Sequence, residues 1–250
     1  MGLNPALCLH AKINALIKPL CNLNMFAQSL SKLSKPGLYL LTPNGISDDP
    51  RGLDKIHSLL TASDCVTLLQ YRDKLANHKT KFNFASKLQA ICKTTNVPLV
   101  INDDVQLALR VKAAGVHLGK NDMPPEQARD ILGRQAIIGA SCYQQLERAE
   151  QAVMAGADYL AFGSMFASKT KPTATRCSLS VLQQAKAKFR QPLVAIGGLT
   201  TENINPVLSA GADWAAVISD VFTAENSALV LNKYQDIFTT FNIGHGSIST

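Results

Sequence analysis

Short apolar segments alternate with amphipathic ones from residue 37 almost to the end of the chain, and this alternation constrains the fold most. Eight segments rich in Val, Ile and Leu have the length of buried strands, namely 37–41, 66–71, 99–102, 116–118, 136–140, 159–162, 193–196 and 215–218. Between them, apolar residues recur every three or four positions, as on one face of a helix. This pattern favours a single α/β domain, a (β/α)8 TIM barrel, over a doubly wound open sheet.

A local repeat supports the same architecture. The segments KAAGVHLG, MAGADYLAFG and SAGADWAAVIS each place Ala-Gly between a helical pattern and a strand. We therefore expect Gly115, Gly156 and Gly211 to lie just past helix C-termini. With no linker in 37–240, we predict one catalytic barrel there, a helical or disordered N-terminal extension over 1–36 and a flexible tail over 241–250.

Composition limits the class of protein. The chain has 250 residues, 46% hydrophobic and 17% charged, which suits one domain with a large core. It contains no apolar run long enough to cross a bilayer, so we expect no membrane partner. Its cysteines are scattered without a CxxC pair, which predicts reduced thiols in a cytoplasmic protein. The sequence leaves homo-oligomerisation open.

The positive charge is unevenly distributed. Of the net charge of +7, residues 1–47 contribute +4, since they carry four lysines and no acid, and the remainder contributes +3. No Lys/Arg cluster is interleaved with aromatic residues, so we expect no nucleic-acid partner. A mildly basic body suits small phosphorylated substrates.

Acidic residues follow two of the predicted strands. Asp103 comes directly after strand 99–102, and Asp122 follows strand 116–118. The C-terminal ends of parallel strands meet at one edge, so these carboxylates can converge there and bind Mg²⁺, whose shell water and phosphate oxygens complete. The alternative is that an Asp in this region only caps the helix that begins near Val105.

Other strand ends carry groups suited to anions. Alternate positions 70, 72 and 74 place Gln70, Arg72 and Lys74 on one side of an extended segment, although Arg72 could instead pair with Asp73. The loop after strand 159–162 offers Ser168, Thr170 and Lys171, with a plain polar surface loop as the alternative.

The last two strands and the fifth complete the predicted site. Gly197-Gly198 and Ile218-Ser219 follow the seventh and eighth strands, where backbone N–H groups of barrels often bind phosphate. No histidine is evidently placed to activate Ser141, so we expect it to hydrogen-bond substrate rather than act as a nucleophile. We expect His117 to be a packed strand residue.

The ordered set LLQYRDK, LVINDDVQLAL, GVHLGKND, GASCY, DYLAFGSMFASKTKP, AIGGL and VIS resembles thiamine-phosphate synthase over residues 37 to about 222. The resemblance implies a TIM-barrel transferase with Mg²⁺ as cofactor. Such an enzyme joins 4-amino-5-hydroxymethyl-2-methylpyrimidine diphosphate to a thiazole phosphate and releases diphosphate. The loop departs from the family pattern at Gly163-Ser164 and Ala167-Ser168, where the family usually has Gly-Pro and Pro-Thr.

The resemblance also implies roles for single residues. Asp103 and Asp122 would bind Mg²⁺, and Arg72, Lys74 and Lys171 would act in catalysis on the diphosphate. The other implied substrate-binding residues are Gln70, Asn102, Ser141, Ser168, Thr170, Gly198, Ile218 and Ser219. Two alternatives stay open: a thiazole tautomerase-like paralogue, and a non-catalytic protein that binds thiamine phosphate.

Overall fold

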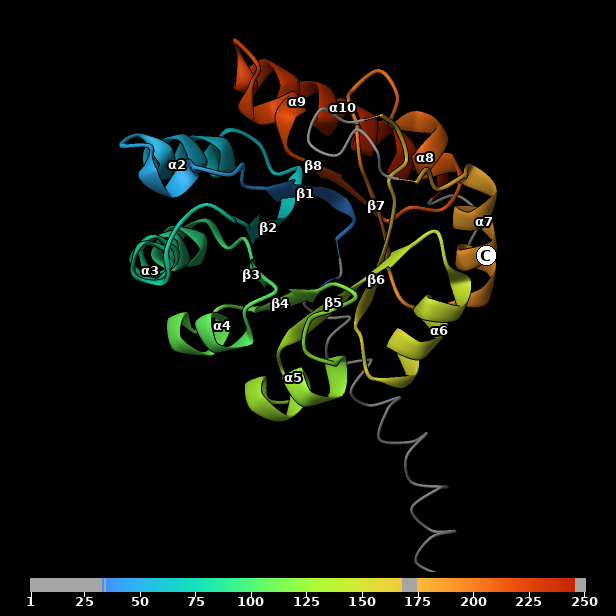
Figure 1. Ribbon diagram of the computed structural model, residues 1–250. Helices are drawn as coiled ribbons and strands as arrows, with labels where there is room; N and C mark the ends of the chain where they lie inside the picture. The colour runs from blue at the N-terminus through green and yellow to red at the C-terminus, as the bar shows by residue number, and fades with distance from the viewer. Residues whose placement is uncertain (1–32, 34, 168–174, 246–250) are drawn as a thin grey trace, which may run out of the picture.

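The chain forms a closed barrel of eight parallel strands, as the computed structural model shows for residues 33, 35–167 and 175–245 (Figure 1). The strands are β1 (Gly37–Leu41), β2 (Val66–Tyr71), β3 (Leu99–Asn102), β4 (Gly115–Leu118), β5 (Ile137–Tyr143), β6 (Tyr159–Phe162), β7 (Leu193–Ile196) and β8 (Trp214–Val217). Each strand pairs with its neighbour in sequence, and β1 pairs with β8 to close the barrel. The predicted fold class is confirmed.

Helices ring the barrel on its outer side (Figure 1). They are the 3-10 helix η1 (Ile46–Asp48) and the α-helices α2 (Gly52–Ala62), α3 (His78–Thr95), α4 (Val105–Val111), α5 (Pro125–Leu132), α6 (Leu146–Met154), α7 (Leu179–Lys188), α8 (Asn205–Ser209), α9 (Ser219–Phe222) and α10 (Ser227–His245). Side chains fix several starts. The Asn77 side chain accepts the Thr80 N–H at 2.9 Å at the start of α3.

Two apolar clusters form the core. One fills the barrel interior and includes Tyr39, Val100, Tyr159 and Trp214, while the other packs the outer strand faces against the helices. Fully burying a Val or Leu side chain contributes about 1.5–3 kcal/mol, so these two layers supply most of the stabilisation. Leu33, which precedes β1, belongs to the interior cluster.

The Ala-Gly prediction is correct at two of its three positions. Gly156 and Gly211, with φ of 87° and 106°, adopt the left-handed conformation after α6 and α8. Gly115 instead begins β4, and Lys112 takes the left-handed C-cap of α4. The glycine is needed at position 115 for packing, because a Cβ there would lie 1.8 Å from the Ile137 carbonyl oxygen.

The structure also bears on the predictions for the C-terminal tail, the cysteines and membrane-spanning segments. Helix α10 continues to His245, into the segment predicted as a tail. The four cysteines in the described part of the chain, Cys65, Cys92, Cys142 and Cys177, are buried and free. In that same part, no helix combines the length and apolar character that a bilayer crossing requires.

Candidate active site

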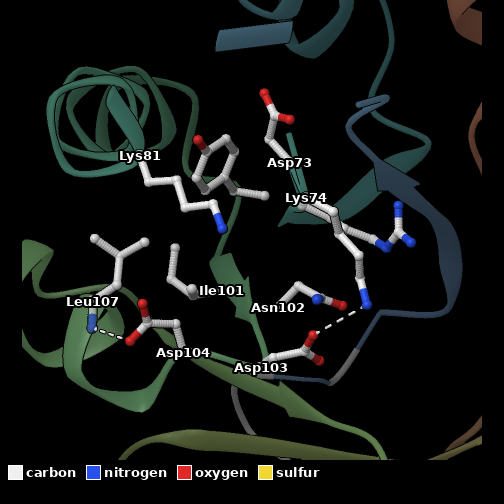
Figure 2. Close-up of a pocket in the computed structure, with 10 residues that line it drawn as sticks. Asp73, Lys74, Lys81, Ile101, Asn102, Asp103, Asp104 and Leu107 are labelled. Carbon is white, nitrogen blue, oxygen red and sulfur yellow. Dashed lines mark hydrogen bonds and ion pairs between the residues drawn. The ribbon is translucent and has the colours of Figure 1, made fainter. Parts of the chain in front are cut away.

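The C-terminal edge of the barrel gathers most of the predicted site residues. Strands β2 to β5 bring Gln70, Arg72, Lys74, Asn102, Asp103, Asp122 and Ser141, and the ends of β7 and β8 bring Gly198, Ile218 and Ser219. Ser168, Thr170 and Lys171 lie outside the described residues. A cavity of about 270 Å³ lies at this edge. Its lining residues, drawn in Figure 2, are Tyr71, Arg72, Asp73, Lys74, Lys81, Ile101, Asn102, Asp103, Asp104 and Leu107.

The two cations after β2 are positioned by the loop that follows β1. Asn44 Oδ1 accepts a hydrogen bond from Arg72 Nη1 at 3.2 Å and from the Lys74 backbone N–H at 3.0 Å. The buried Thr42 hydroxyl bonds both the N–H and the carbonyl of Arg72. These contacts hold the backbone of the RDK segment while leaving the Lys74 ammonium at the cavity.

Asp73, between the two cations, has a structural task. Its carboxylate accepts backbone N–H groups from Gly45 at 3.0 Å, Ser47 at 3.1 Å and Leu75 at 3.1 Å. Burial alone would raise the pKa of Asp73, but these donors together keep that pKa below its usual value. Asp73 therefore fastens the β1 loop to β2 and is not the partner of Arg72.

Asp104, and not Asp103, is the residue that caps the helix after β3. Asp104 is the N-cap of α4, because its carboxylate accepts the Leu107 N–H at 2.8 Å (Figure 2). Asp103 has a left-handed backbone with φ of 64°, which Asp tolerates better than most residues. Its N–H donates to the His117 carbonyl at 2.9 Å, so the strained residue is anchored on β4.

The Asp103 side chain faces both a cation and a second carboxylate. Lys74 Nζ lies 3.6 Å from Asp103 Oδ2 in a solvent-exposed ion pair. Burial and the neighbouring Asp122 carboxylate raise the pKa of Asp103. Asp122 Oδ2 accepts the Gly119 N–H at 2.6 Å, which fixes its position at the end of β4.

This pair of carboxylates fits a hard divalent cation. Two acidic side chains that repel one another are stabilised when Mg²⁺ lies between them. Within residues 33, 35–167 and 175–245, no group of three or more His, Cys, Asp or Glu side chains could hold a metal. A cation at Asp103 and Asp122 would keep positions for water and phosphate oxygens.

Inside the barrel mouth, Gln70 and Ser141 are joined to buried partners. Gln70 lies at the end of β2, with Nε2 donating to the Tyr39 hydroxyl at 2.7 Å. Ser141 lies within β5, which continues to Tyr143 through an irregularity in its pairing with β6, and the Ser141 hydroxyl is 2.9 Å from His117 Nε2. His117 is buried on β4, as predicted. The expectation that no histidine lies within reach of Ser141 is wrong, because the pairing of β4 with β5 brings His117 beside it.

At the ends of β7 and β8, the predicted site consists mainly of backbone groups. Gly198 has φ of 64°, and a Cβ at this position would lie 2.3 Å from the Ala167 carbonyl oxygen. The β7 loop can therefore lie against the β6 loop only with glycine here. Asn203 Nδ2 donates to the Gly198 carbonyl at 2.9 Å, and Ile218-Ser219 begins α9 beside this loop.

Sequence reasoning missed several residues of this site. Lys81 on α3 lines the cavity, and Figure 2 shows its ammonium directed inward. The sequence did not indicate this position, because a lysine in an amphipathic helix usually faces solvent. Asn44, Tyr39 and Tyr159 were also missed, because their contacts depend on strand pairing around the barrel.

Comparison with known proteins decides the family. The model of the thiamine monophosphate synthase family matches residues 38–221. The chain belongs to this family. It is 47% identical over 202 residues to thiamine-phosphate synthase from Azoarcus sp. (strain BH72), covering 81% of this chain and 97% of that protein. Thiamine-phosphate synthase from Xylella fastidiosa (strain 9a5c) is 45% identical over 207 residues, 82% of this chain and 86% of the relative.

A solved structure agrees with the family assignment. The thiamine phosphate pyrophosphorylase from Pyrococcus furiosus superposes with a TM-score of 0.73 at 33% identity, covering 82% of this chain and 96% of that one. Thiamine-phosphate synthases are transferases, so the predicted enzyme class and the resemblance are both confirmed.

Proposed function

We propose that this enzyme joins 4-amino-5-hydroxymethyl-2-methylpyrimidine diphosphate to a thiazole phosphate, giving thiamine phosphate and diphosphate. One observation carries the proposal: a single cavity at the C-terminal barrel edge presents Arg72, Lys74 and Lys81 beside the Asp103 carboxylate. Three cations next to a pair of acids suit a diphosphate with its metal. The β7 and β8 loops, with Gly198 and Ser219, lie on the same edge for the thiazole phosphate.

The chemistry needs charge and position rather than a nucleophilic side chain. The C–O bond between the pyrimidine methylene and diphosphate breaks, and its electron pair leaves with diphosphate. The thiazole nitrogen then donates its lone pair to the methylene cation and forms the C–N bond. Arg72 and Lys74 stabilise the departing charge, and Lys171 joins them in this proposal. Asn102 and Gln70 orient the pyrimidine diphosphate, and Ser168 and Thr170 contact the thiazole phosphate.

Asp103 and Asp122 are the residues that would hold Mg²⁺. When bound there, the metal supplies Lewis-acid charge to the diphosphate oxygens. We expect chelation with EDTA to abolish turnover and added Mg²⁺ to restore it. Full activity in excess EDTA with metal-free substrates would contradict this part of the proposal.

The deciding experiment measures diphosphate release with both substrates present. We expect release that depends on the thiazole phosphate and on Arg72, with Arg72→Ala slower by about 10²–10³ fold. Arg190→Ala removes an exposed arginine outside the site and is the matched control. A purified, folded enzyme that tautomerises the thiazole phosphate or only binds thiamine phosphate, without releasing diphosphate, would overturn the proposal.

The buried, free thiols of Cys65, Cys92, Cys142 and Cys177 support a reducing, cytoplasmic location, which we include in the proposal.

A further inference from the structure

A continuous line of hydrogen bonds crosses the interior of the barrel from Gln70 to Ser141. Gln70 Nε2 lies 2.7 Å from the Tyr39 hydroxyl, which lies 2.8 Å from the Tyr159 hydroxyl. The Tyr159 hydroxyl lies 2.9 Å from His117 Nδ1, and His117 Nε2 lies 2.9 Å from Ser141 Oγ. The line therefore connects two predicted substrate ligands through three residues that have no assigned role.

The three linking side chains are rigidly held. Tyr39 and Tyr159 are 1% and 0% exposed and His117 is 8% exposed. The two tyrosine rings meet edge to face at 5.9 Å, and His117 stacks on Tyr159 at 5.6 Å. Burial raises the pKa of both tyrosines far above neutrality, so each hydroxyl keeps its proton to donate.

The backbone of β5 is shaped to admit this arrangement. A Cβ on Gly139 would lie 1.9 Å from Tyr159 Cζ and 2.3 Å from its hydroxyl oxygen. The Tyr159 ring consequently lies directly against bare backbone. Any side chain at position 139 would displace the central member of the line.

The Gln70 amide fixes which atom donates at every step. Its Nε2 can only donate, so the Tyr39 hydroxyl accepts from Gln70 and gives its own proton to Tyr159. Tyr159 accepts that bond and donates its proton to His117 Nδ1. His117 Nδ1 is then an acceptor, so the ring proton is on Nε2 and is donated to Ser141 Oγ.

The two ends of the line differ in hydrogen bonding, because Ser141 can donate to a ligand and Gln70 Oε1 can accept from one. Ser141 Oγ already accepts a bond from His117, so its own proton is available to a ligand. Gln70 uses one of its two amide N–H donors on Tyr39, and its Oε1 accepts no hydrogen bond from the residues that the structure describes. The site thus presents one hydroxyl donor and one amide acceptor.

We propose that Tyr39, Tyr159 and His117 are positioning residues that preset Ser141 as a donor and Gln70 as an acceptor, and so select an aminopyrimidine ring. An aminopyrimidine offers the matching pair, since its ring nitrogens accept and its exocyclic amine donates. In the corresponding 4-oxo pyrimidine the exocyclic oxygen accepts and a ring nitrogen carries a proton, so polar groups of the site are left unpaired. The proposal rests on the proposed function for the identity of the pyrimidine diphosphate.

The first test needs no turnover. In ¹⁵N-histidine-labelled enzyme, with the His117 signals assigned by their loss in a His117→Gln variant, we expect the tautomer protonated at Nε2. A wild-type His117 protonated at Nδ1 would overturn the proposal, because every donor in the line would then be reversed.

The second test compares ligands by calorimetry with the thiazole phosphate absent. We expect the pyrimidine diphosphate to bind wild-type enzyme at least about tenfold more tightly than its 4-oxo analogue, the effect of one well-formed hydrogen bond. We expect Tyr159→Phe to lose most of this preference. Equal discrimination by wild type and by a folded Tyr159→Phe variant would overturn the proposal, whatever the rate of turnover.

Kinetics separate positioning from general damage. We expect Tyr159→Phe to raise KM for the pyrimidine diphosphate about tenfold and to leave KM for the thiazole phosphate unchanged. Thr67→Val is the matched control, since it removes the hydrogen bond that Trp214 Nε1 donates to Thr67 near the start of β2, away from the site.

If Tyr159→Phe fails to fold, Tyr39→Phe breaks the adjacent link and is measured in the same assays. Failure of the proposed function would appear as absent diphosphate release, with the tautomer and binding results still decisive.

Discussion

The two adjacent acids after β3, Asp103 and Asp104, have different contacts because the left-handed backbone at Asp103 points their side chains in different directions. Asp104 caps α4, whereas Asp103, with φ of 64°, directs its carboxylate to Lys74 and Asp122. The amino-acid sequence predicted metal binding at Asp103, with capping of the next helix by an Asp of this segment as the alternative. It could not identify the capping residue, because that depends on a left-handed residue that no periodicity reveals.

Because Asp104 caps α4 and Asp103 does not, substitutions at the two residues should have opposite effects on stability and turnover. Asp104→Ala should lower the free energy of unfolding by about 1 kcal/mol through loss of the cap. Asp103→Asn should leave that free energy unchanged or slightly higher, since it removes repulsion with Asp122, while Mg²⁺-dependent turnover falls by about 10² or more. Denaturant unfolding and a diphosphate-release assay measure both effects. A stable Asp103→Asn variant with near-normal turnover would return Asp103 to a structural role.

Lys81 extends the set of cations beyond those that the family resemblance names. Its ammonium lines the cavity with Arg72 and Lys74 and has no ion pair among the residues that the structure describes. We expect Lys81→Ala to raise KM for the pyrimidine diphosphate about threefold to tenfold, with Lys81→Arg restoring most of the loss. Lys79→Ala, an exposed lysine on the same helix, is the control. Equal KM values in Lys81→Ala and Lys79→Ala would exclude Lys81 from substrate binding.

At the scale of elements, strands were the most predictable part of the molecule. Buried parallel strands are continuous apolar runs, so β1, β2, β3, β6 and β7 have the predicted limits. β5 was predicted to end at residue 140 but runs to Tyr143, because an irregular pairing carries polar Ser141 into the strand. The hydrogen-bonded line through Tyr39 and Tyr159 escaped prediction, since partners 120 residues apart meet only after the barrel closes.

A substitution at Gly139 tests whether β5 can tolerate a side chain against the Tyr159 ring. Gly139→Ala places a methyl group inside the volume of the Tyr159 ring, so the ring must move or the strand must shift. We expect a loss of about 1–3 kcal/mol in stability from overpacking, together with weaker binding of the pyrimidine diphosphate. Combining Gly139→Ala with Tyr159→Phe should not relieve the clash, because the ring remains. A Gly139→Ala variant with wild-type melting temperature and KM would show that the Tyr159 ring can be displaced freely.

At the scale of the whole molecule, the described part of the chain has the proposed site at one end of the barrel and Leu33 before the start of β1. The proposed ligands in the described part of the chain lie at the C-terminal ends of the strands, and Leu33 precedes β1 in the interior cluster with Trp214. Period and strand count predicted this architecture, since every β-α unit repeats the same alternation. They could not define the start of the barrel, because a single leucine before β1 carries no periodic signal.

Leu33 therefore divides the N-terminal segment into two parts with different predicted importance. Deleting residues 1–24, so that the chain begins at Met25, should leave melting temperature and turnover unchanged. The family model begins at residue 38, and the Azoarcus relative aligns over 97% of its own length with only 81% of this chain. The proposed substrate ligands all lie at Gln70 or later. The opposing expectation, that Leu3, Leu7, Ile13, Leu16, Ile17 and Leu20 form a helix plugging the barrel, concerns residues outside the described part of the chain.

A longer deletion makes the test decisive. Removing residues 1–35 also removes Leu33, which is 6% exposed, and should cost about 2–5 kcal/mol, as truncating a buried leucine does. Leu33→Ala in the full chain is the matched control, and it should reproduce most of that loss because the same apolar contacts disappear. Thermal melts and diphosphate release on the three proteins measure the effects. If the chain that begins at Met25 aggregates or melts well below wild type while Leu33→Ala is stable, the segment before Met25 is part of the folded barrel. If it instead keeps its stability and loses activity, a residue of the active site lies before Met25.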